Sequence, residues 1–171
     1  MLDTEIRSRP ARLDDLPRLT EIYNHYVLAT PITFDVEPVT VAGRRDWFDA
    51  HAPSGRYRLL VAEQDGVVLG YASSGRFRTK PAYETSVEFS VYLAPERTGN
   101  GVGSLLYRRL LDELAGADVH RAYAGVCLPN EASQRLHRRF GFQPIGVYRE
   151  VGRKFGRYWD VQWFEREVDA A

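Results

Sequence analysis

The chain has 171 residues, of which 44% are hydrophobic and 27% charged. These proportions are typical of one soluble globular domain, which we expect to span 1–171. The 23 Lys and Arg residues are balanced by 23 Asp and Glu residues, so charge gives no reason to expect nucleic acid or an anionic membrane as a partner. Cys127 is the only cysteine, which excludes an internal disulfide, and segment 1–15 is charged without an apolar stretch. We therefore expect a cytoplasmic protein with neither a signal peptide nor a membrane span.

The first third of the chain predicts a strand, a helix, a loop and a second short helix. We expect the strand over 5–9, and Asp14 is a candidate N-cap for the helix that follows. A proline-bounded loop over 30–38 separates this helix from a second one over 41–51, which Thr40 can cap. The apolar residues that recur at helical spacing in the first helix are Leu16, Leu19, Ile22, Tyr23, Tyr26 and Val27.

The middle third predicts a hairpin, a further strand and a helix. The runs 57–63 and 67–74 read as strands joined by the turn Asp65-Gly66. A strand over 84–93 then leads, through a glycine-rich loop, into a helix over 101–114.

The last third predicts a strand over 120–128 and a helix over 131–140 with Asn130 as its N-cap. Two final strands, 142–148 and 158–168, are joined by the glycine-marked segment VGRKFGR. This order of elements predicts an α/β (α+β) fold with a mixed central sheet flanked by helices.

Three glycines stand between the 84–93 strand and its helix, at positions 99, 101 and 103. A helix N-terminus offers unpaired N–H groups and positive dipole, and a glycine turn lets an anion lie directly against them. We therefore expect a phosphate or pyrophosphate site, with Arg97 as a candidate counter-charge. The loop lacks Gly-Lys-Ser/Thr and does not read G-x-G-x-x-G, which weakens the nucleoside-triphosphate and dinucleotide interpretations.

The segment Val91-Tyr92-Leu93, followed by RTGNGVG at 97–103 and a helix, resembles the acyl-coenzyme A motif of the GNAT acetyltransferase superfamily. Asn130-Glu131-Ala132-Ser133, followed by LHRRFGF at 136–142, resembles its second motif, and IRSRPARLDDLPRLTEIYN resembles its usual first strand and helix. The resemblance covers nearly the whole chain. It implies the GNAT-type acyl-CoA N-acyltransferase fold and acetyl-CoA as co-substrate.

A narrower resemblance is to the phosphinothricin / methionine sulfoximine N-acetyltransferase family. It implies a small amino-acid-like acceptor and, because such proteins are commonly dimers, a homodimer. The segments that carry it are Tyr23-Asn24, Thr33-Phe34, Ala82-Tyr83, Val87-Glu88, Leu128-Pro129-Asn130 and KFGRYWD at 154–160.

The resemblance also implies which residues contact the cofactor. The pantetheine arm is expected to pair with the end of the 84–93 strand, and the pyrophosphate to lie on the glycine loop. One departure is that Thr98 stands where the superfamily usually has Gln or Arg, with Arg97 one step earlier. The expected cofactor-binding residues are Ser90, Val91, Tyr92, Leu93, Thr98, Gly99, Asn100, Gly101, Val102, Gly103, Ser104, Asn130 and Ser133.

Acetyl transfer to an amine needs a base, because only the free amine attacks. On the 84–93 strand, alternation places Glu88 with Ser90 and Tyr92 on one face, near the expected cofactor. Partial burial there would raise the pKa of Glu88 toward neutrality, and the resemblance also places a catalytic glutamate here. His137 occupies a position where many superfamily members carry a tyrosine; it is either a proton donor to the sulfur or a packed helix histidine. The remaining histidines show no ligand spacing, so no metal site is expected.

The segment GRFRTKPAY at 75–83 mixes cations with aromatic residues and suits an anionic substrate group. The residues expected to contact the acceptor are Phe34, Arg78, Lys80, Tyr83 and Glu88. Phosphinothricin, methionine sulfoximine and methionine sulfone fit this description. Three alternatives stay open: another acceptor amine (a peptide N-terminus or a polyamine), a catalytically silent coenzyme A sensor, and a nucleotide-binding α/β domain.

Overall fold

The computed structural model describes residues 5–168, in which seven strands form one sheet in the order β1-β2-β3-β4-β5-β7-β6. The ends of the predicted domain, 1–4 and 169–171, lie outside the described residues. The strands are β1 (Arg7–Pro10), β2 (Leu59–Gln64), β3 (Val67–Arg76), β4 (Ser86–Leu93), β5 (Arg121–Cys127), β6 (Gln143–Lys154) and β7 (Arg157–Glu167). The α-helices are α1 (Leu16–Ala29), α2 (Arg45–Asp49), α3 (Val102–Leu114) and α4 (Glu131–Arg139).

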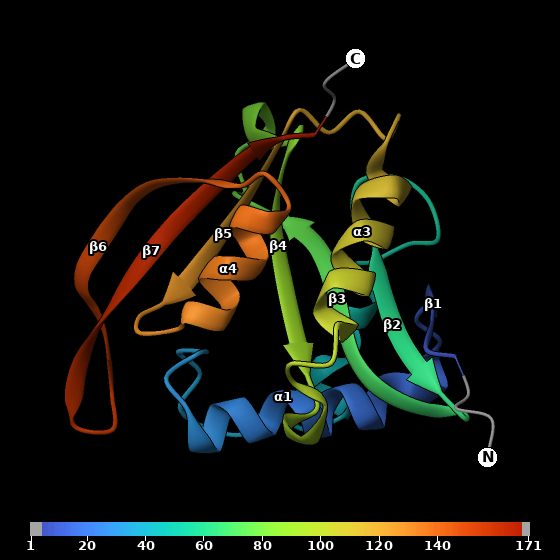
Figure 1. Ribbon diagram of the computed structural model, residues 1–171, viewed down its shortest axis with the longest axis horizontal. Helices are drawn as coiled ribbons and strands as arrows, with labels where there is room; N and C mark the ends of the chain where they lie inside the picture. The colour runs from blue at the N-terminus through green and yellow to red at the C-terminus, as the bar shows by residue number, and fades with distance from the viewer. Residues whose placement is uncertain (1–4, 169–171) are drawn as a thin grey trace.

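Helices cover both faces of this mixed sheet. In Figure 1, α3 and α4 lie side by side on one face, while α1 runs across the end of β4. The larger apolar core lies on the α3 side and includes Val87 and Phe89 of β4. A smaller core packs Leu19 and Ile22 of α1 against the opposite face, where Tyr92 also lies. The alternation predicted for β4 is therefore observed, and it assigns its even-numbered residues to the α1 side.

The β4–β5 junction is the one place in this sheet where neighbouring strands run parallel. Only three residue pairs join them, from Ser86↔Arg121 to Glu88↔Tyr123, whereas every other neighbouring pair of strands is antiparallel. Beyond Glu88 the strands separate, so the last part of β4 is paired only with β3. An open strand edge of this kind offers unpaired backbone N–H and C=O groups to a ligand.

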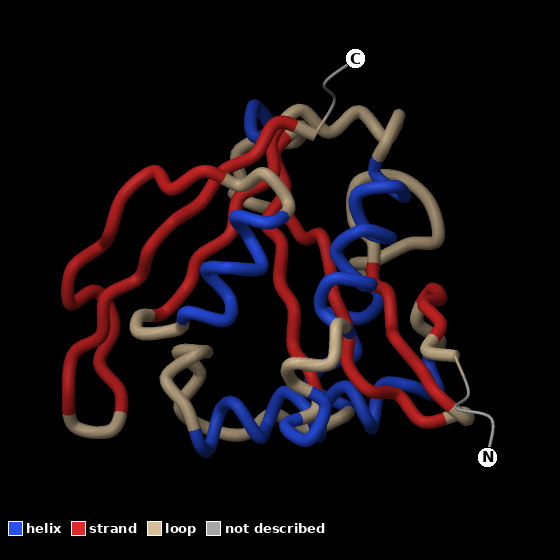
Figure 2. The backbone as a smooth tube through the Cα atoms, in the orientation of Figure 1, coloured by secondary structure: helices blue, strands red, loops and turns tan. Residues whose placement is uncertain are grey.

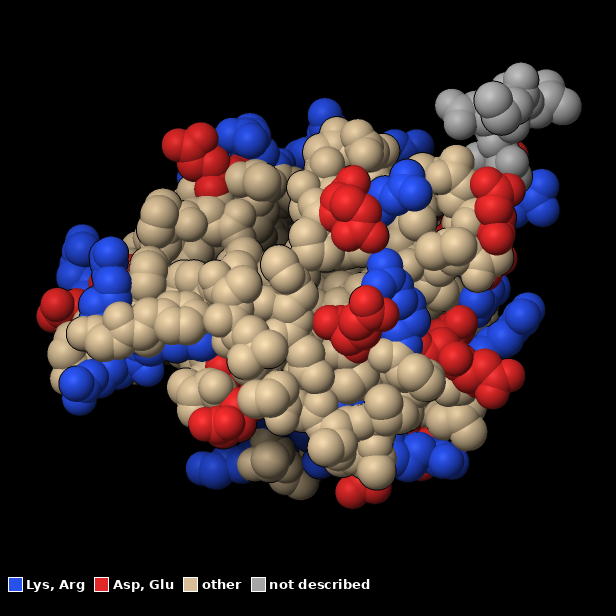
Figure 3. All heavy atoms as spheres, turned by 90° about the horizontal axis from the view of Figure 1, so that it is seen from below, with Lys and Arg blue, Asp and Glu red and all other residues tan. Residues whose placement is uncertain are grey.

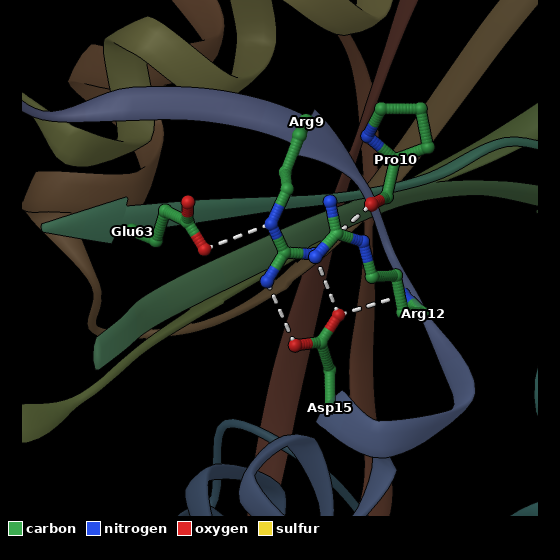
Figure 4. A network of polar contacts seen from close by, with 5 residues as sticks. All are labelled: Arg9, Pro10, Arg12, Asp15 and Glu63. Carbon is green, nitrogen blue, oxygen red and sulfur yellow. Dashed lines mark hydrogen bonds and ion pairs between the residues drawn. The ribbon is translucent and has the colours of Figure 1, made fainter. Parts of the chain in front are cut away.

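A polar network fixes the start of α1 against the sheet (Figure 4). Arg9 donates to Glu63 at 2.8 Å and pairs with Asp15 at 2.8 Å, and Asp15 also accepts the N–H of Arg12 at 2.6 Å. Burial raises the pKa of Asp15, but the hydrogen bonds from Arg9 and Arg12 outweigh it, and the net shift is downward. The expected N-cap Asp14 is wrong: the residue before the helix is Asp15, whose side chain is committed to this network and does not cap α1.

Two predicted segments differ from the structure. The second helix is shorter than expected, with a 3₁₀ turn at Ala42–Arg44 before α2, although Thr40 Oγ1 does accept the Gly43 N–H at 2.9 Å. The segment VGRKFGR is mostly strand, because the chain reverses only at Phe155-Gly156, where both φ angles are positive. Such a two-residue turn lets the ladder continue almost to its end. β6 and β7 thus form a long hairpin, the β6–β7 arm (143–167), which extends away from the body of the molecule (Figures 1 and 2).

Gly70 lets β3 approach the end of β4 closely. A Cβ at this position would lie 2.9 Å from the carbonyl oxygen of Tyr92 and 3.0 Å from Cα of Leu93. We expect Gly70→Ala to lower the free energy of unfolding by about 1–3 kcal/mol, as measured by urea denaturation, because backbone atoms cannot move aside as a side chain does.

The control is Gly75→Ala in the same strand, where a Cβ would meet nothing within 4 Å. This substitution is expected to be neutral or slightly stabilising. Equal losses for the two variants would contradict the steric explanation.

Candidate active site

A cavity of about 710 Å³ lies where β4 and β5 separate, and we call it the transfer cavity. Its volume is in the range of sites for small molecules and cofactors. Its walls come from the 30–38 loop, the end of β4, the start of α3, α4 and β7. The predicted site residues that line it are Phe34, Glu88, Ser90, Val91, Tyr92, Leu93, Gly99, Gly101, Gly103, Ser104, Asn130, Ser133 and His137.

Other predicted site residues lie outside this lining. Val102 is buried in the main core, and Thr98 and Asn100 are exposed in the loop before α3. On the acceptor side, the exposed residues Arg78, Lys80 and Tyr83 do not line the cavity either.

The glycine loop separates into two kinds of glycine. Gly99 and Gly101 have φ angles of 81° and 80°, and a Cβ on either would meet nothing within 4 Å. Backbone conformation therefore requires glycine at both positions, and open space lies in front of them. Gly103 has an ordinary helical conformation, and a Cβ there would touch Leu136 of α4 at 3.4 Å. This distance is an ordinary van der Waals contact, so neither backbone conformation nor packing requires glycine at 103, although this residue also lines the cavity.

The start of α3 lacks a side-chain cap. The N–H groups of its first turn therefore have no partner from an N-cap side chain and remain available for a ligand. Two α4 residues that sequence reasoning missed, Arg135 and Arg139, also line the cavity. Arg139 donates to Ser104 Oγ in the first turn of α3 at 3.1 Å, and Arg135 pairs with Glu131 at 3.2 Å. This end of the transfer cavity thus combines a helix N-terminus with two cations, as an anion site requires.

The end of β4 is held by α1. The hydroxyl of Tyr26 donates to the carbonyl oxygen of Leu93 at 2.6 Å, and the Ala94 N–H donates to Leu69 at 2.8 Å. Tyr26 lines the cavity but was not predicted, because its role depends on a contact between residues far apart in sequence. These bonds fix the open edge of β4 along which a ligand can pair.

Glu88 lies at the last position where β4 pairs with β5, half-buried in the wall of the transfer cavity. Burial raises the pKa of its carboxyl, and the positive charge of Arg78 acts in the opposite direction without cancelling the shift. Among residues 5–168, no hydrogen bond or ion pair involves this carboxylate. Its oxygens are therefore available to a substrate or a water molecule.

His137 is enclosed by other side chains and is only 3% exposed. Its Nδ1 lies 2.7 Å from the carbonyl oxygen of Ser133, which can only accept, so Nδ1 carries the proton. Its Nε2 then accepts from the Tyr107 hydroxyl at 2.9 Å, and the ring stacks on Phe164. Burial lowers the pKa of His137. Of the two roles left open by the sequence, this environment favours the packed helix histidine.

The acceptor end of the cavity contains aromatic residues that sequence reasoning missed. Trp163 of β7 lies over Gly125 of β5, where a Cβ would come within 3.2 Å of the indole ring. Tyr148 also lines this end. Arg78 lies over Phe77 at 4.3 Å and near Trp163 at 5.9 Å, just outside the lining. This end suits a small molecule that has both an apolar and an anionic part.

Residues 19–142 match the acetyltransferase (GNAT) family. The chain belongs to this family. The GNAT fold expected from the sequence is confirmed. The enzyme is an N-acetyltransferase that depends on acetyl-CoA. Membership in the family argues against the nucleotide-binding alternative, and relatives named as N-acetyltransferases argue against the silent sensor.

Two curated relatives are similar over nearly their whole length. The acetyltransferase is 59% identical to the phosphinothricin N-acetyltransferase of Streptomyces coelicolor over 166 residues, which cover 96% of this chain and 97% of the relative. It is 39% identical to the L-methionine sulfoximine/L-methionine sulfone acetyltransferase of Salmonella typhimurium over 155 residues, 91% of this chain and 90% of the relative.

Two solved structures that contain acetyl-CoA are also similar. An acetyltransferase from Salmonella typhimurium matches with a TM-score of 0.90 at 37% identity, covering 97% of this chain and 95% of the other. A GNAT superfamily phosphinothricin acetyltransferase from Sinorhizobium meliloti matches with a TM-score of 0.90 at 32% identity, covering 95% of this chain and 88% of the other.

The residues of the acetyltransferase fit acetyl-CoA, its cofactor. The open glycines, the uncapped start of α3 and the two arginines of α4 suit the pyrophosphate, and the free edge of β4 suits the pantetheine amides. Within 5–168, no group of three His, Cys, Asp or Glu side chains is arranged to hold a metal ion. None of the helices in this range is long and apolar enough to cross a membrane.

Proposed function

We propose that this enzyme transfers the acetyl group of acetyl-CoA directly to the α-amine of a small amino-acid analogue of the phosphinothricin, methionine sulfoximine or methionine sulfone type. The observation that carries the proposal is the unpartnered carboxylate of Glu88 in the wall of the transfer cavity, at the point where β4 and β5 separate. The names of the curated relatives, which cover the same length of chain, support this class of acceptor.

Glu88 acts in this proposal as the general base, through a water molecule. Acetyl-CoA, when bound, supplies the activated acetyl thioester. The carboxylate of Glu88 takes the proton that the substrate ammonium must lose, and the amine nitrogen then forms its bond to the acetyl carbon as the carbon–sulfur bond breaks. A backbone N–H on the open edge at Tyr92 or Leu93 stabilises the charge that develops on the carbonyl oxygen. The leaving thiolate takes up the second proton, which the nitrogen loses as the amide forms.

The cofactor is held in two places. Thr98, Asn100 and Val102 contribute backbone donors beside Gly99 and Gly101, and Arg135 and Arg139 supply the charge that Thr98 lacks. At the pantetheine, Asn130 Oδ1 already accepts the Ser133 N–H at 3.1 Å, so its amide N–H₂ donates to the cofactor.

The acceptor contacts Phe34 and, from the 75–83 segment, Arg78, Lys80 and Tyr83. Phe34 lines the cavity, and Arg78 is close enough to Glu88 to affect its pKa. An anionic group of the acceptor pairs with Arg78, which leaves the α-amine to face Glu88. Lys80 and Tyr83 are exposed at the end of the same segment and contact the acceptor as it enters.

The acceptor assignment is tested by steady-state release of coenzyme A thiol from acetyl-CoA with a panel of amines. The panel contains phosphinothricin, methionine sulfoximine, methionine sulfone, plain methionine, spermidine and a peptide N-terminus. Turnover confined to the first three supports the proposal. Turnover with spermidine or the peptide alone would leave the enzyme class intact and overturn the acceptor.

The enzyme functions in this proposal as a cytoplasmic homodimer of single N-acetyltransferase domains. The continuous sheet of residues 5–168 supports one domain, and the apolar surface of the β6–β7 arm supports the dimer. In Figure 3 the arm, at the left, carries tan surface bordered by the blue of Lys and Arg. The large apolar side chains of the arm that are 53–55% exposed are Ile145, Tyr148, Val151, Phe155 and Tyr158.

Placing a charge on this surface should separate the protomers. We expect Ile145→Glu to convert a dimer into a monomer in analytical ultracentrifugation, because a charge in an apolar interface is left unpaired. The control is Val67→Glu, at a similarly exposed site (53%) in β3, which β4, β5 and β7 separate from β6 in the sheet. A monomeric wild type would overturn the dimer.

A further inference from the structure

A second cavity, of about 300 Å³, lies beside α1 and the loop before α2, and we call it the Arg44 cavity. Ser73 of β3 and Ser90 of β4 form part of its wall, and Asp35 lies at an exposed point of its lining. Ser90 and Tyr92 line both this cavity and the transfer cavity. The two cavities are therefore neighbours on the same side of β4.

The guanidinium of Arg44 lies within an aromatic cage. Its Cζ is 3.8 Å from the ring centre of Trp47, 4.4 Å from that of Tyr23 and 5.7 Å from that of Tyr71. The close aromatic contacts stabilise a cation through its flat faces. The rings cover the flat faces of the guanidinium, so only its edge, where the N–H groups point, is available for hydrogen bonds.

These N–H groups are poorly satisfied by the protein. Nη1 donates to the Leu19 carbonyl at 3.2 Å and to the Tyr71 hydroxyl at 3.4 Å, and Nη2 reaches the same hydroxyl at 3.5 Å. The two bonds to Tyr71 are near the upper limit for a hydrogen bond. Among residues 5–168, none of the ion pairs includes Arg44, and no acceptor is found for its Nε.

A buried cation without an anionic partner is energetically costly, and Arg44 is only 7% exposed. Asp35 lines the same cavity but forms no ion pair with Arg44, so a ligand carboxylate against the guanidinium would supply the missing charge and accept two parallel N–H groups. Ser73 and Ser90 add hydroxyl donors on the same wall. The cavity thus has the chemistry of a carboxylate site, and its volume lies at the lower end of the range for small-molecule sites.

The negative charge of Asp35 restricts which carboxylate ligands fit the Arg44 cavity. Its carboxylate accepts the Tyr23 hydroxyl at 2.7 Å and lines the same cavity as Arg44. It would repel a dicarboxylate but attract an ammonium group. A molecule with one carboxylate and one ammonium group, an α-amino acid, matches both charges.

We propose that the Arg44 cavity binds an α-amino acid, with its carboxylate on Arg44 and its ammonium group toward Asp35. The ammonium group is then held by a carboxylate other than Glu88, so the bound molecule is not in position for transfer. The bound molecule is either a free amino acid or the acceptor itself, held next to the transfer cavity before it reacts.

The test uses L-alanine as probe, without acetyl-CoA, on wild type, Arg44→Gln and the control Arg45→Gln. Arg45 is the exposed neighbour of Arg44 and pairs with Asp49. At constant ionic strength, L-alanine is expected to bind wild type in calorimetry and to raise its unfolding temperature. Arg44→Gln is expected to weaken this binding at least tenfold, and Arg45→Gln less than twofold.

Asp35→Asn is a second variant, at an exposed position that should not disturb folding. It is expected to weaken L-alanine binding several-fold without weakening the binding of acetate, because acetate has no ammonium group for Asp35 to attract and its carboxylate is no longer repelled. Because Asp35→Asn leaves Arg44 in place, this variant tests the proposal even if Arg44→Gln does not fold.

Kinetics with the acceptor found in the panel distinguish the two sources. If L-alanine competes with the acceptor and Arg44→Gln raises the acceptor KM, the site holds the acceptor; if L-alanine does not compete, the site is separate. Unchanged binding of L-alanine by both Arg44→Gln and Asp35→Asn would overturn the proposal and leave Arg44 as a packing residue. The binding experiment does not depend on turnover, so its failure is distinct from failure of the proposed acceptor.

Discussion

Glu88→Gln is expected to lower kcat for acetyl transfer by about 100- to 10,000-fold, the range over which general bases contribute. The amide has the shape of the carboxylate but cannot take the proton of the substrate ammonium. Because Glu88 is expected to contact the acceptor and not the cofactor, the KM for acetyl-CoA should stay unchanged. Steady-state kinetics with both substrates measure the two effects separately.

The matched control is Glu84→Gln, an exposed glutamate just before β4 that does not line the transfer cavity. Its kcat should remain within about twofold of wild type, as for a surface substitution away from the site. A Glu88→Gln enzyme with nearly normal kcat would show that another group, or solvent alone, accepts the proton.

The pH dependence of kcat/KM follows from the carboxyl group of Glu88. Burial raises the pKa of Glu88, and the carboxylate is the active form of a base, so kcat/KM should increase as the pH rises through this raised pKa. Arg78 lowers the pKa of Glu88. Removing its charge in Arg78→Ala should therefore move the acid limb of the profile to higher pH. A limb that stays in place, or moves to lower pH, would contradict the assignment of this limb to Glu88.

Gly101→Ala is expected to raise the KM for acetyl-CoA about tenfold or more, equivalent to roughly 1.4 kcal/mol of lost binding. Gly101 has a φ of 80° and directly precedes α3, so a side chain there both strains the turn and occupies the space in front of the helix N-terminus. Isothermal calorimetry with coenzyme A measures the same loss without turnover.

Strain alone is controlled by Gly116→Ala. Gly116 has a φ of 76°, and a Cβ there also meets nothing within 4 Å, but it lies beyond the other end of α3 and outside the transfer cavity. Both variants should lose about 1–2 kcal/mol of stability, the cost of a left-handed conformation for a residue with a Cβ. If Gly116→Ala weakened cofactor binding as much as Gly101→Ala, the loop would not be the site of contact.

Several features of the site could be predicted because they depend on residues close together in sequence. The two-residue period of β4 placed Glu88 on the face opposite Phe89, and the Asx cap at Asn130 marked the start of α4. The glycines at 99 and 101 indicated a backbone that side chains cannot adopt. Each of these patterns is enforced by local geometry, so it is visible before any tertiary contact is known.

Local patterns were less reliable where two interpretations share the same residues. Gly103 belongs to the spacing of the loop but has an ordinary helical conformation in the first turn of α3, and the glycine-marked VGRKFGR is mostly strand. Glycine permits a turn, a close approach or a plain strand, and only the neighbouring elements decide among them.

The sequence by itself thus determined the order of the elements, the family, the glycine loop and the face on which Glu88 lies. The tertiary structure alone decided which distant residues meet: Tyr26 with the carbonyl of Leu93, Tyr107 with His137, and Arg44 with the rings of Tyr23 and Tyr71. These partners are separated by up to 67 residues and come together only through the strand order and the packing of helices on the sheet. Burial then decides their chemistry, because desolvation shifts a pKa or leaves a charge without a partner only once neighbouring elements exclude water.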